Sequence, residues 1–170
     1  MADDPVRLEP WGPGDLPILE KTLAVPEMTT YLGGPESAEK LAERQAKFER
    51  LADSGSGRMF KVVDSTTNEP VGSVGYWDKT WRDEVYEIGW MVMPEFQGRG
   101  IGAAATALAI ERARADGKHR FLHAYPSVEN EASNAICRKL GFELRGEHEF
   151  EYPPGSFMRC NDWRLDLRAV

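Results

Sequence analysis

The spacing of apolar residues changes period along this chain, and the changes predict an alternation of strands and helices. Runs with alternating apolar residues, or with many β-branched and aromatic ones, predict strands over residues 6–9, 59–63, 71–77, 84–93, 120–125, 142–150 and 163–167. Apolar residues recurring every three to four positions predict helices over residues 15–23, 37–51, 100–116 and 130–141. The order β-αα-βββ-α-β-α-ββ predicts an α/β fold, with one mixed sheet, in a single domain over 1–170.

Local signals at the ends of the later elements agree with these boundaries. Asn130 stands where an N-cap is expected, and Gly117 and Gly141 follow the last residues of two predicted helices. The strand after Gly141 alternates through Leu144 and His148, which predicts that one of its faces is buried.

Composition narrows the classes of protein. The 170 residues are 41% hydrophobic and 29% charged, as in an ordinary globular domain, and no apolar run approaches the roughly 20 residues of a membrane span. Two cysteines make no disulfide framework and residues 1–4 lack a secretory apolar region, so we expect a cytoplasmic protein. The net charge of −7 argues against nucleic acid as a partner. It mildly favours a cationic substrate such as an amine, although solubility alone also explains it.

The segment after the strand that stops at Pro94 carries the most specific chemistry. Gly98, Gly100 and Gly102 alternate with other residues, and an alanine-rich helix follows at once. Such glycines bring backbone N–H groups close to a ligand, and the helix adds the positive end of its dipole. The pattern predicts a site for a phosphate or pyrophosphate, with a tight turn that binds nothing as the alternative.

A P-loop and a dinucleotide-binding loop are two other kinds of glycine-rich phosphate site. A P-loop is excluded because no Gly-Lys-(Ser/Thr) follows. The spacing Gly98-x-Gly100-x-x-Ala103 loosely fits a dinucleotide fingerprint, but residues 94–97 intervene between strand and loop. The next strand, which ends at Tyr125, also offers no carboxylate for a ribose. A dinucleotide-binding module therefore stays as a minor alternative.

The loop resembles a known family. Gln97-x-x-Gly100-x-Gly102 is similar to the acyl-CoA motif of the GNAT N-acetyltransferase superfamily, and the segment from Asn130 to Leu140-Gly141-Phe142 resembles its next motif. Residues 6–10 and 87–90 resemble the ribosomal-protein acetyltransferase (RimJ/RimL-like) branch. The resemblance implies a GNAT fold and direct transfer of an acetyl group from acetyl-CoA to a primary amine in a ternary complex. The acceptor would be a small molecule, peptide or protein, with no metal, nucleic acid or membrane involved. A homodimer is an option in such folds, and a noncatalytic acyl-CoA sensor remains the alternative function.

The resemblance also implies which residues contact the cofactor. They belong to the strand end, the glycine loop and the start of the Asn130 helix: Met91, Val92, Met93, Gln97, Gly98, Arg99, Gly100, Ile101, Gly102, Ala103, Asn130, Ser133 and Asn134. The amide of Val92 or Met93 would face the thioester carbonyl, where acyl transfer builds negative charge. Simpler roles compete, since Met91 and Met93 suit a core and Ser133 and Asn134 suit an exposed helix face.

Three residues are candidates for proton transfer. Strand alternation places Glu87 on the face of Gly89 and Met91, so Glu87 is the predicted proton acceptor, directly or through water. An ion-paired structural carboxylate is the alternative. Cys137 stands where many members of the superfamily carry a tyrosine that protonates the leaving thiolate. The thiol could serve instead, or Cys137 could be a small buried residue that leaves this step to Ser133 or water.

Aromatic residues near Glu87 could wall the acceptor pocket and hold a cationic amine. The candidates are Trp77, Trp81, Tyr86, His123 and Tyr125. Two of these, His123 and Tyr125, are also rival proton acceptors. Core packing is the competing explanation for each aromatic residue, and it suits Trp81, in a polar connection, least well. We expect no metal site because no His/Cys cluster has the spacing of metal ligands.

Overall fold

The computed structural model describes residues 4–79, 84–151 and 154–169. Trp81, predicted to line the acceptor pocket, therefore lies outside the described residues. These described residues form seven strands: β1 (Val6–Pro10), β2 (Gly57–Asp64), β3 (Pro70–Asp78), β4 (Val85–Val92), β5 (Phe121–Ala124), β6 (Glu143–Glu151) and β7 (Phe157–Asp166). The α-helices are α1 (Leu16–Thr22), α2 (Ala38–Leu51), α3 (Ile101–Asp116) and α4 (Glu131–Lys139), with 3₁₀ turns η1 (Pro26–Met28) and η2 (Pro94–Phe96). This order and the mixed α/β class confirm the predicted fold.

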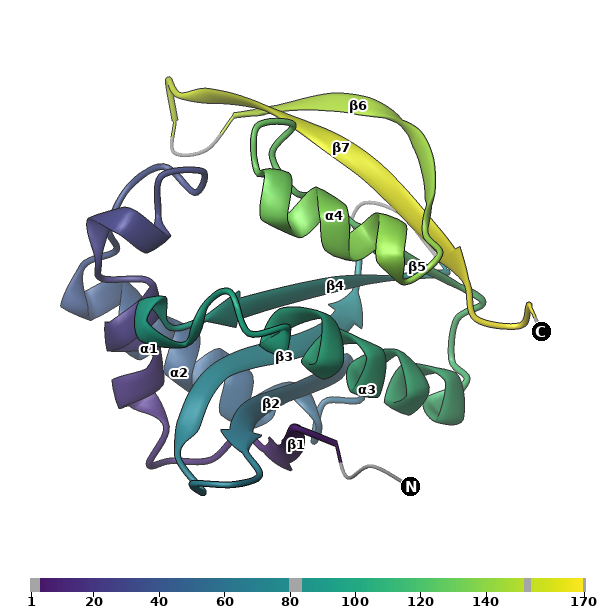
Figure 1. The fold of residues 1–170 in the computed structure, drawn as a ribbon. Coiled ribbons are helices and arrows are strands. Elements are labelled where there is room, and N and C mark those ends of the chain that lie inside the picture. The colour runs from purple at the N-terminus through teal and green to yellow at the C-terminus, as the bar shows by residue number, and fades with distance from the viewer. Residues whose placement is uncertain (1–3, 80–83, 152–153, 170) are drawn as a thin grey trace.

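The strands form one sheet in the order β1-β2-β3-β4-β5-β7-β6. Every neighbouring pair is antiparallel except β4 and β5, which run parallel. Figure 1 shows α3 and α4 on one side of the sheet and α1 and α2 on the other. The chain must cross from β4 to the parallel β5, and α3 provides this crossover.

Alternation along the central strands assigns side chains to the two faces. On β4, Tyr86 and Ile88 pack into the core with residues of α3 and α4. Met91, on the other face, packs with the cluster formed by α1 and α2, as does Trp77 of β3. Glu87 lies between Tyr86 and Ile88 in sequence and therefore faces the α1–α2 side, together with Met91.

The strands β4 and β5 separate after a short stretch of pairing. Val85–Glu87 pair with Phe121–His123, and β5 ends at Ala124. Within the described part of the chain, β3 is therefore the only strand paired with residues 88–92 of β4. Backbone groups that point away from β3 in this stretch face the gap between the strands. This separation is the feature of the sheet that positions the site.

Strand β6 corrects one prediction. It lies at the edge of the sheet and pairs with β7 alone among the described strands, so nearly all its residues are exposed. Leu144, expected on a buried face, is 52% exposed. The last strand also begins at Phe157, six residues before the predicted start, because it pairs along the whole of β6. Among the described residues, no helix is both long and apolar enough to cross a membrane.

Candidate active site

The glycine loop between β4 and α3 presents an array of backbone donors. Gly98 and Gly100 have φ angles of 79° and 77°, in the left-handed region that favours glycine. A Cβ atom at either position would meet nothing within 4 Å, so the loop is open on that side. The first helical bond runs from Ala104 N to Gly100 O at 3.1 Å. The N–H groups of residues 98–103 have no acceptor among the described residues. Unpaired N–H groups of this kind at a helix N-terminus can bind an anion.

Side chains around the loop hold its position. The amide Nε2 of Gln97 donates to Val92 O at 3.0 Å, which ties the loop back to the end of β4. A Cβ atom on Gly102 would come within 2.9 Å of Ile136 Cδ1, so this glycine lets α3 approach α4 closely. Arg99 is exposed, with its guanidinium 5.6 Å from the Phe96 ring centre, where it adds positive charge beside the loop. Gln97 and Gly102 thus shape the loop, while the donors come from its backbone.

The end of β4 distinguishes between the two predicted amides. Met93 is 1% exposed, and its N–H donates to Val71 O at 2.9 Å across the β3–β4 ladder. This bond corrects the suggestion that the Met93 amide is available to a ligand. Neighbouring residues of an antiparallel strand point their N–H groups in opposite directions. The amides of Val92 and Trp90 therefore point away from β3, into the gap that opens beyond Glu87. The Trp90 amide was not predicted, although strand alternation alone would have included it.

At the start of α4, two asparagines have structural partners. Asn130 Oδ1 accepts a hydrogen bond from Ser133 N at 3.2 Å, which confirms its N-cap role. Asn134 is 2% exposed and forms four side-chain hydrogen bonds. Its Nδ2 donates to Ser127 O and Asn130 O at 2.9 and 2.8 Å, and its Oδ1 accepts from Asn161 Nδ2 at 2.9 Å and Trp163 Nε1 at 2.8 Å. All its donors and acceptors are used within the protein, which corrects the expectation that Asn134 contacts the cofactor.

Cys137 lies one turn further along α4, in the hydrophobic core. Its side chain is fully buried among residues of α3 and of the sheet. Burial raises the pKa of this thiol to about 12, against a small opposing effect of Arg138. A thiol that is both inaccessible and reluctant to ionise packs as a small apolar residue. This placement agrees with the alternative of a small buried residue and disfavours Cys137 as a proton donor.

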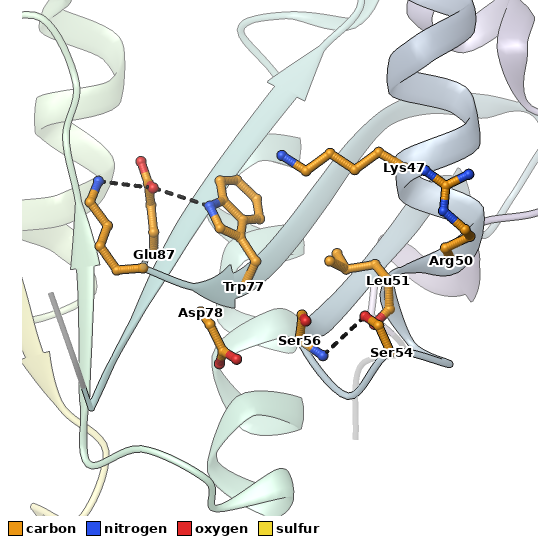
Figure 2. Close-up of a pocket in the computed structure, with 9 residues that line it drawn as sticks. Lys47, Arg50, Leu51, Ser54, Ser56, Trp77, Asp78 and Glu87 are labelled. Carbon is orange, nitrogen blue, oxygen red and sulfur yellow. Dashed lines mark hydrogen bonds and ion pairs between the residues drawn. The ribbon is translucent and has the colours of Figure 1, made fainter. Parts of the chain in front are cut away.

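Glu87 lies in a pocket on the α1–α2 side of the sheet, with a partly exposed carboxylate. One oxygen, Oε2, accepts hydrogen bonds from Trp77 Nε1 at 3.1 Å and from Lys79 Nζ at 3.0 Å (Figure 2). The other oxygen, Oε1, takes no hydrogen bond from the described residues, and the side chain is 26% exposed. A Cβ atom on Gly89 would lie 3.0 Å from the Trp77 ring, so this glycine makes room for the indole. Glu87 is thus an ion-paired carboxylate with one oxygen left for a ligand.

His123 of β5 and Tyr125, directly after this strand, lie on the same side of the sheet as Glu87. In the strand register His123 is opposite Glu87. The imidazole is 3% exposed, and its Nδ1 lies 2.6 Å from Asp162 Oδ1; the second oxygen of Asp162 lies 3.2 Å from His148 Nε2. The Tyr125 ring stacks on His123 and holds Lys79 Nζ at 4.0 Å from its centre. His123 and Asp162 are thus buried beside Glu87, whereas Tyr125 is half-buried like Glu87 itself.

Tyr86 corrects the remaining pocket assignment. It is 2% exposed, faces α3, and packs against Tyr76 and His119. It lies on the opposite face of β4 from Glu87, so it cannot line the same pocket. Two residues near the site were not predicted, Lys79 and Asp162. Lys79 falls just past the predicted end of its strand, and Asp162 one residue before the predicted start of its own, where no alternation rule was applied.

The chain is similar to known acetyltransferases in sequence. A family model described as an acetyltransferase (GNAT) domain matches residues 6–143. An L-methionine sulfoximine/L-methionine sulfone acetyltransferase of Pseudomonas paraeruginosa is 34% identical over 117 residues, which cover 66% of this chain and 65% of that protein. The match thus spans slightly less than two thirds of the relative.

Solved structures share the fold over nearly the whole chain. An acetyl transferase of Salmonella typhimurium, described as modifying the N-terminal serine of ribosomal protein L7/L12, has a TM-score of 0.80 at 21% identity, with 96% of each chain covered. A spermidine N-acetyltransferase of Vibrio cholerae, in complex with CoA and spermine, has a TM-score of 0.80 at 19% identity, with 97% of each chain covered. At these identities the likeness concerns the fold.

Proposed function

Because the chain belongs to the GNAT acetyltransferase family, we propose that it transfers the acetyl group of acetyl-CoA directly to a primary amine within a ternary complex. The observation that carries this proposal is the run of N–H groups over residues 98–103, without acceptors among the described residues, beside the gap between β4 and β5. A pyrophosphate fits such an array because two glycines with positive φ leave the approach open.

The cofactor would be held mainly by the backbone. The N–H groups of residues 98–103 would bind the pyrophosphate, and Arg99 would add charge. The amides of Trp90 and Val92 point into the gap, where an extended pantetheine arm could pair with β4 as a further strand would. Ser133 lies in the first turn of α4, the helix that follows β5. When bound, acetyl-CoA supplies an activated acetyl group on a good leaving thiolate.

The chain's own groups would then assist the transfer in two ways. An amide donor on β4 would stabilise the oxygen of the thioester as negative charge develops on it. Glu87 Oε1 would accept, directly or through water, the proton that the acceptor's ammonium must lose before the neutral amine attacks the thioester carbonyl. Lys79 and Trp77 hold the other oxygen of the carboxylate and thereby fix its direction. Most of the acceleration would come from this positioning.

Relatives and neighbours support an amine as the acceptor. The Pseudomonas relative is named for L-methionine sulfoximine and L-methionine sulfone, and the two structural neighbours for spermidine and an N-terminal serine. Each of these molecules offers a primary amine. We therefore propose that the acceptor amine binds toward the Glu87 end of its pocket.

The test is release of the CoA thiol from acetyl-CoA in the presence of a broad panel of primary amines. Acetyl transfer predicts thiol release that depends on both the amine and the enzyme. No release with any amine, together with tight CoA binding, would favour the noncatalytic sensor. Binding of NADH in preference to CoA would favour the dinucleotide module instead.

Glu87→Gln tests the assignment of the proton acceptor. We expect turnover at neutral pH to fall roughly 100-fold or more, since general-base catalysis typically contributes a factor of about 10² to 10⁴. The affinity for CoA should stay unchanged, because the substitution is distant from the glycine loop. Glu69→Gln, in an exposed turn between β2 and β3, is the matched control. Equal turnover in the wild type and Glu87→Gln would return Glu87 to a purely structural role.

A further inference from the structure

The pocket that contains Glu87 is built from three elements and has a volume of about 620 Å³. Lys47 and Arg50 come from α2, Trp77 and Asp78 from β3, and Glu87 from β4, with Lys79 just beyond β3. Figure 2 shows Lys47 extending from α2 toward Trp77, with Glu87 beyond the indole. The pocket therefore has a carboxylate at one end, cations at the other and an aromatic ring between them.

The two carboxylates of the pocket form ion pairs, whereas its two cations on α2 form none with the described residues. Glu87 is paired with Lys79 at 3.0 Å, and Asp78 is paired with Lys118 at 2.5 Å and His119 at 2.8 Å. These contacts neutralise both carboxylates of the pocket. Among the described residues, neither Lys47 nor Arg50 has a carboxylate within ion-pair distance. The pocket lining thus has three cations against two carboxylates, in a chain whose net charge is −7.

A surplus of cations would repel an acceptor that carries positive charge alone. A polyamine would place its second ammonium near Lys47 and Arg50, where like charges disfavour binding. A carboxylate at that end would instead meet an ammonium and a guanidinium, which bind carboxylates through charge-assisted hydrogen bonds. The middle of such a molecule would lie against the Trp77 ring, whose position is set by its hydrogen bond to Glu87.

We propose that the acetyl acceptor is a small amine that also ends in a carboxylate, with the amine toward the Glu87 end of the pocket and the carboxylate at Lys47 and Arg50. This inference rests on the proposed acetyltransferase function and adds the substrate class. Because Trp77 separates the two ends, the amine and the carboxylate should be several bonds apart, as in a dipeptide or an amino acid with a distant amine. Lys47 and Arg50 determine specificity and take no part in the chemical step.

Matched pairs of amines test the proposal. 6-Aminohexanoate and its carboxamide have the same amine on the same chain and differ in the terminal charge, as do glycylglycine and its C-terminal amide. We expect kcat/KM to be about tenfold higher for the carboxylate of each pair, since two partly exposed ion pairs contribute roughly this factor. The preference should shrink as salt screens these charges.

Substitutions on α2 test whether Lys47 and Arg50 cause the preference for carboxylates. Lys47→Gln with Arg50→Gln should lower kcat/KM for the carboxylates and abolish the preference for the carboxylate within each pair. Lys40→Gln, on the same helix and outside the pocket, should retain the wild-type preference. Equal kcat/KM within each pair in the wild type, or an unchanged preference in the double variant, would overturn the proposal.

A binding measurement separates a wrong substrate class from a wrong acetyltransferase function. Quenching of tryptophan fluorescence by 6-aminohexanoate and by its carboxamide measures binding without any reaction. Thiol release without a carboxylate preference would reject the substrate class and keep the function. Saturable binding that favours the carboxylate and needs Lys47 and Arg50, without thiol release, would keep the subsite and reject the function. Neither binding nor release would reject both.

Discussion

Replacing Asn134 by leucine separates a structural role from a cofactor role. The side chain forms four hydrogen bonds at 2.8–2.9 Å and is 2% exposed. The carbonyls of Ser127 and Asn130 accept other backbone bonds and would stay satisfied, but the buried Trp163 Nε1 would lose its acceptor. An unsatisfied buried donor costs about 1–3 kcal/mol, and each further bond contributes about 1 kcal/mol net. We expect Asn134→Leu to lower the free energy of unfolding by roughly 3–4 kcal/mol.

A loss of this size is easily measured. For a domain of about 150–250 residues, each 1 kcal/mol lowers the thermal midpoint by roughly 2–4 °C, so the midpoint should fall by about 10 °C. Ala135→Leu, which adds the same side chain to the exposed neighbouring position, is the control and should change the midpoint little. Affinity for CoA, measured well below the midpoint, should stay within about threefold of the wild type, far less than the tenfold change that 1.4 kcal/mol represents. An unchanged midpoint with a large loss of affinity would refute the structural role.

Three further predictions concern the loop, the core and the end of α3. Gly100→Ala should destabilise the protein by about 1–2 kcal/mol, because an alanine at φ 77° is strained, whereas Gly14→Ala should have little effect; thermal midpoints decide. In native protein neither cysteine should react with a thiol reagent at pH 8, because both are buried and the pKa of Cys137 is about 12, and both should react in denaturant; fast native labelling would contradict the placement. Burial opposes the ionisation of Asp116, but hydrogen bonds, led by that from Arg58, hold its pKa below the usual range. Its stabilisation is therefore complete above about pH 4 and lost as pH falls through the lowered value. The deficit of Asp116→Asn in urea unfolding should shrink in acid, and a constant deficit would exclude this cause.

The sequence predicted the order of elements because the signals that set them are local. Caps such as Asn130, glycines such as Gly117 and the change of apolar period all act within a few residues. The position of a strand within the sheet is set by distant segments. Leu144 follows an alternating pattern, yet it lies on an edge strand covered by no helix among the described residues, so the pattern could not reveal its exposure.

In the candidate site, too, local features were predictable and contacts between distant segments were not. The glycine loop was predictable because its chemistry belongs to consecutive backbone groups, and the structure gives the loop open donors at those residues. Side-chain roles were not predictable from helix or strand position alone. Asn134 and Cys137 lie one turn apart on the buried face of α4, and only their partners on α3, β7 and the β5–α4 loop show that they support the fold.

The distance along β4 between the proposed groups decides how the proton moves. At a rise of about 3.3 Å per residue, Val92 lies roughly 16 Å from Glu87 along the strand, and Trp90 roughly 10 Å. Both amides point into the gap, whereas the Glu87 side chain extends only a few ångströms and stands perpendicular to the sheet. At these separations along the strand, we expect Glu87 to reach an amine that attacks a carbonyl held near either amide through water. Under the proposed function we therefore expect the Trp90 amide to be the better donor for the developing oxyanion, with one or more waters carrying the proton to Glu87. Such a relay predicts that Glu87→Asp, which shortens the side chain by one methylene, keeps much of the turnover that Glu87→Gln loses. Equally low turnover in the two variants would contradict a water relay and require direct contact.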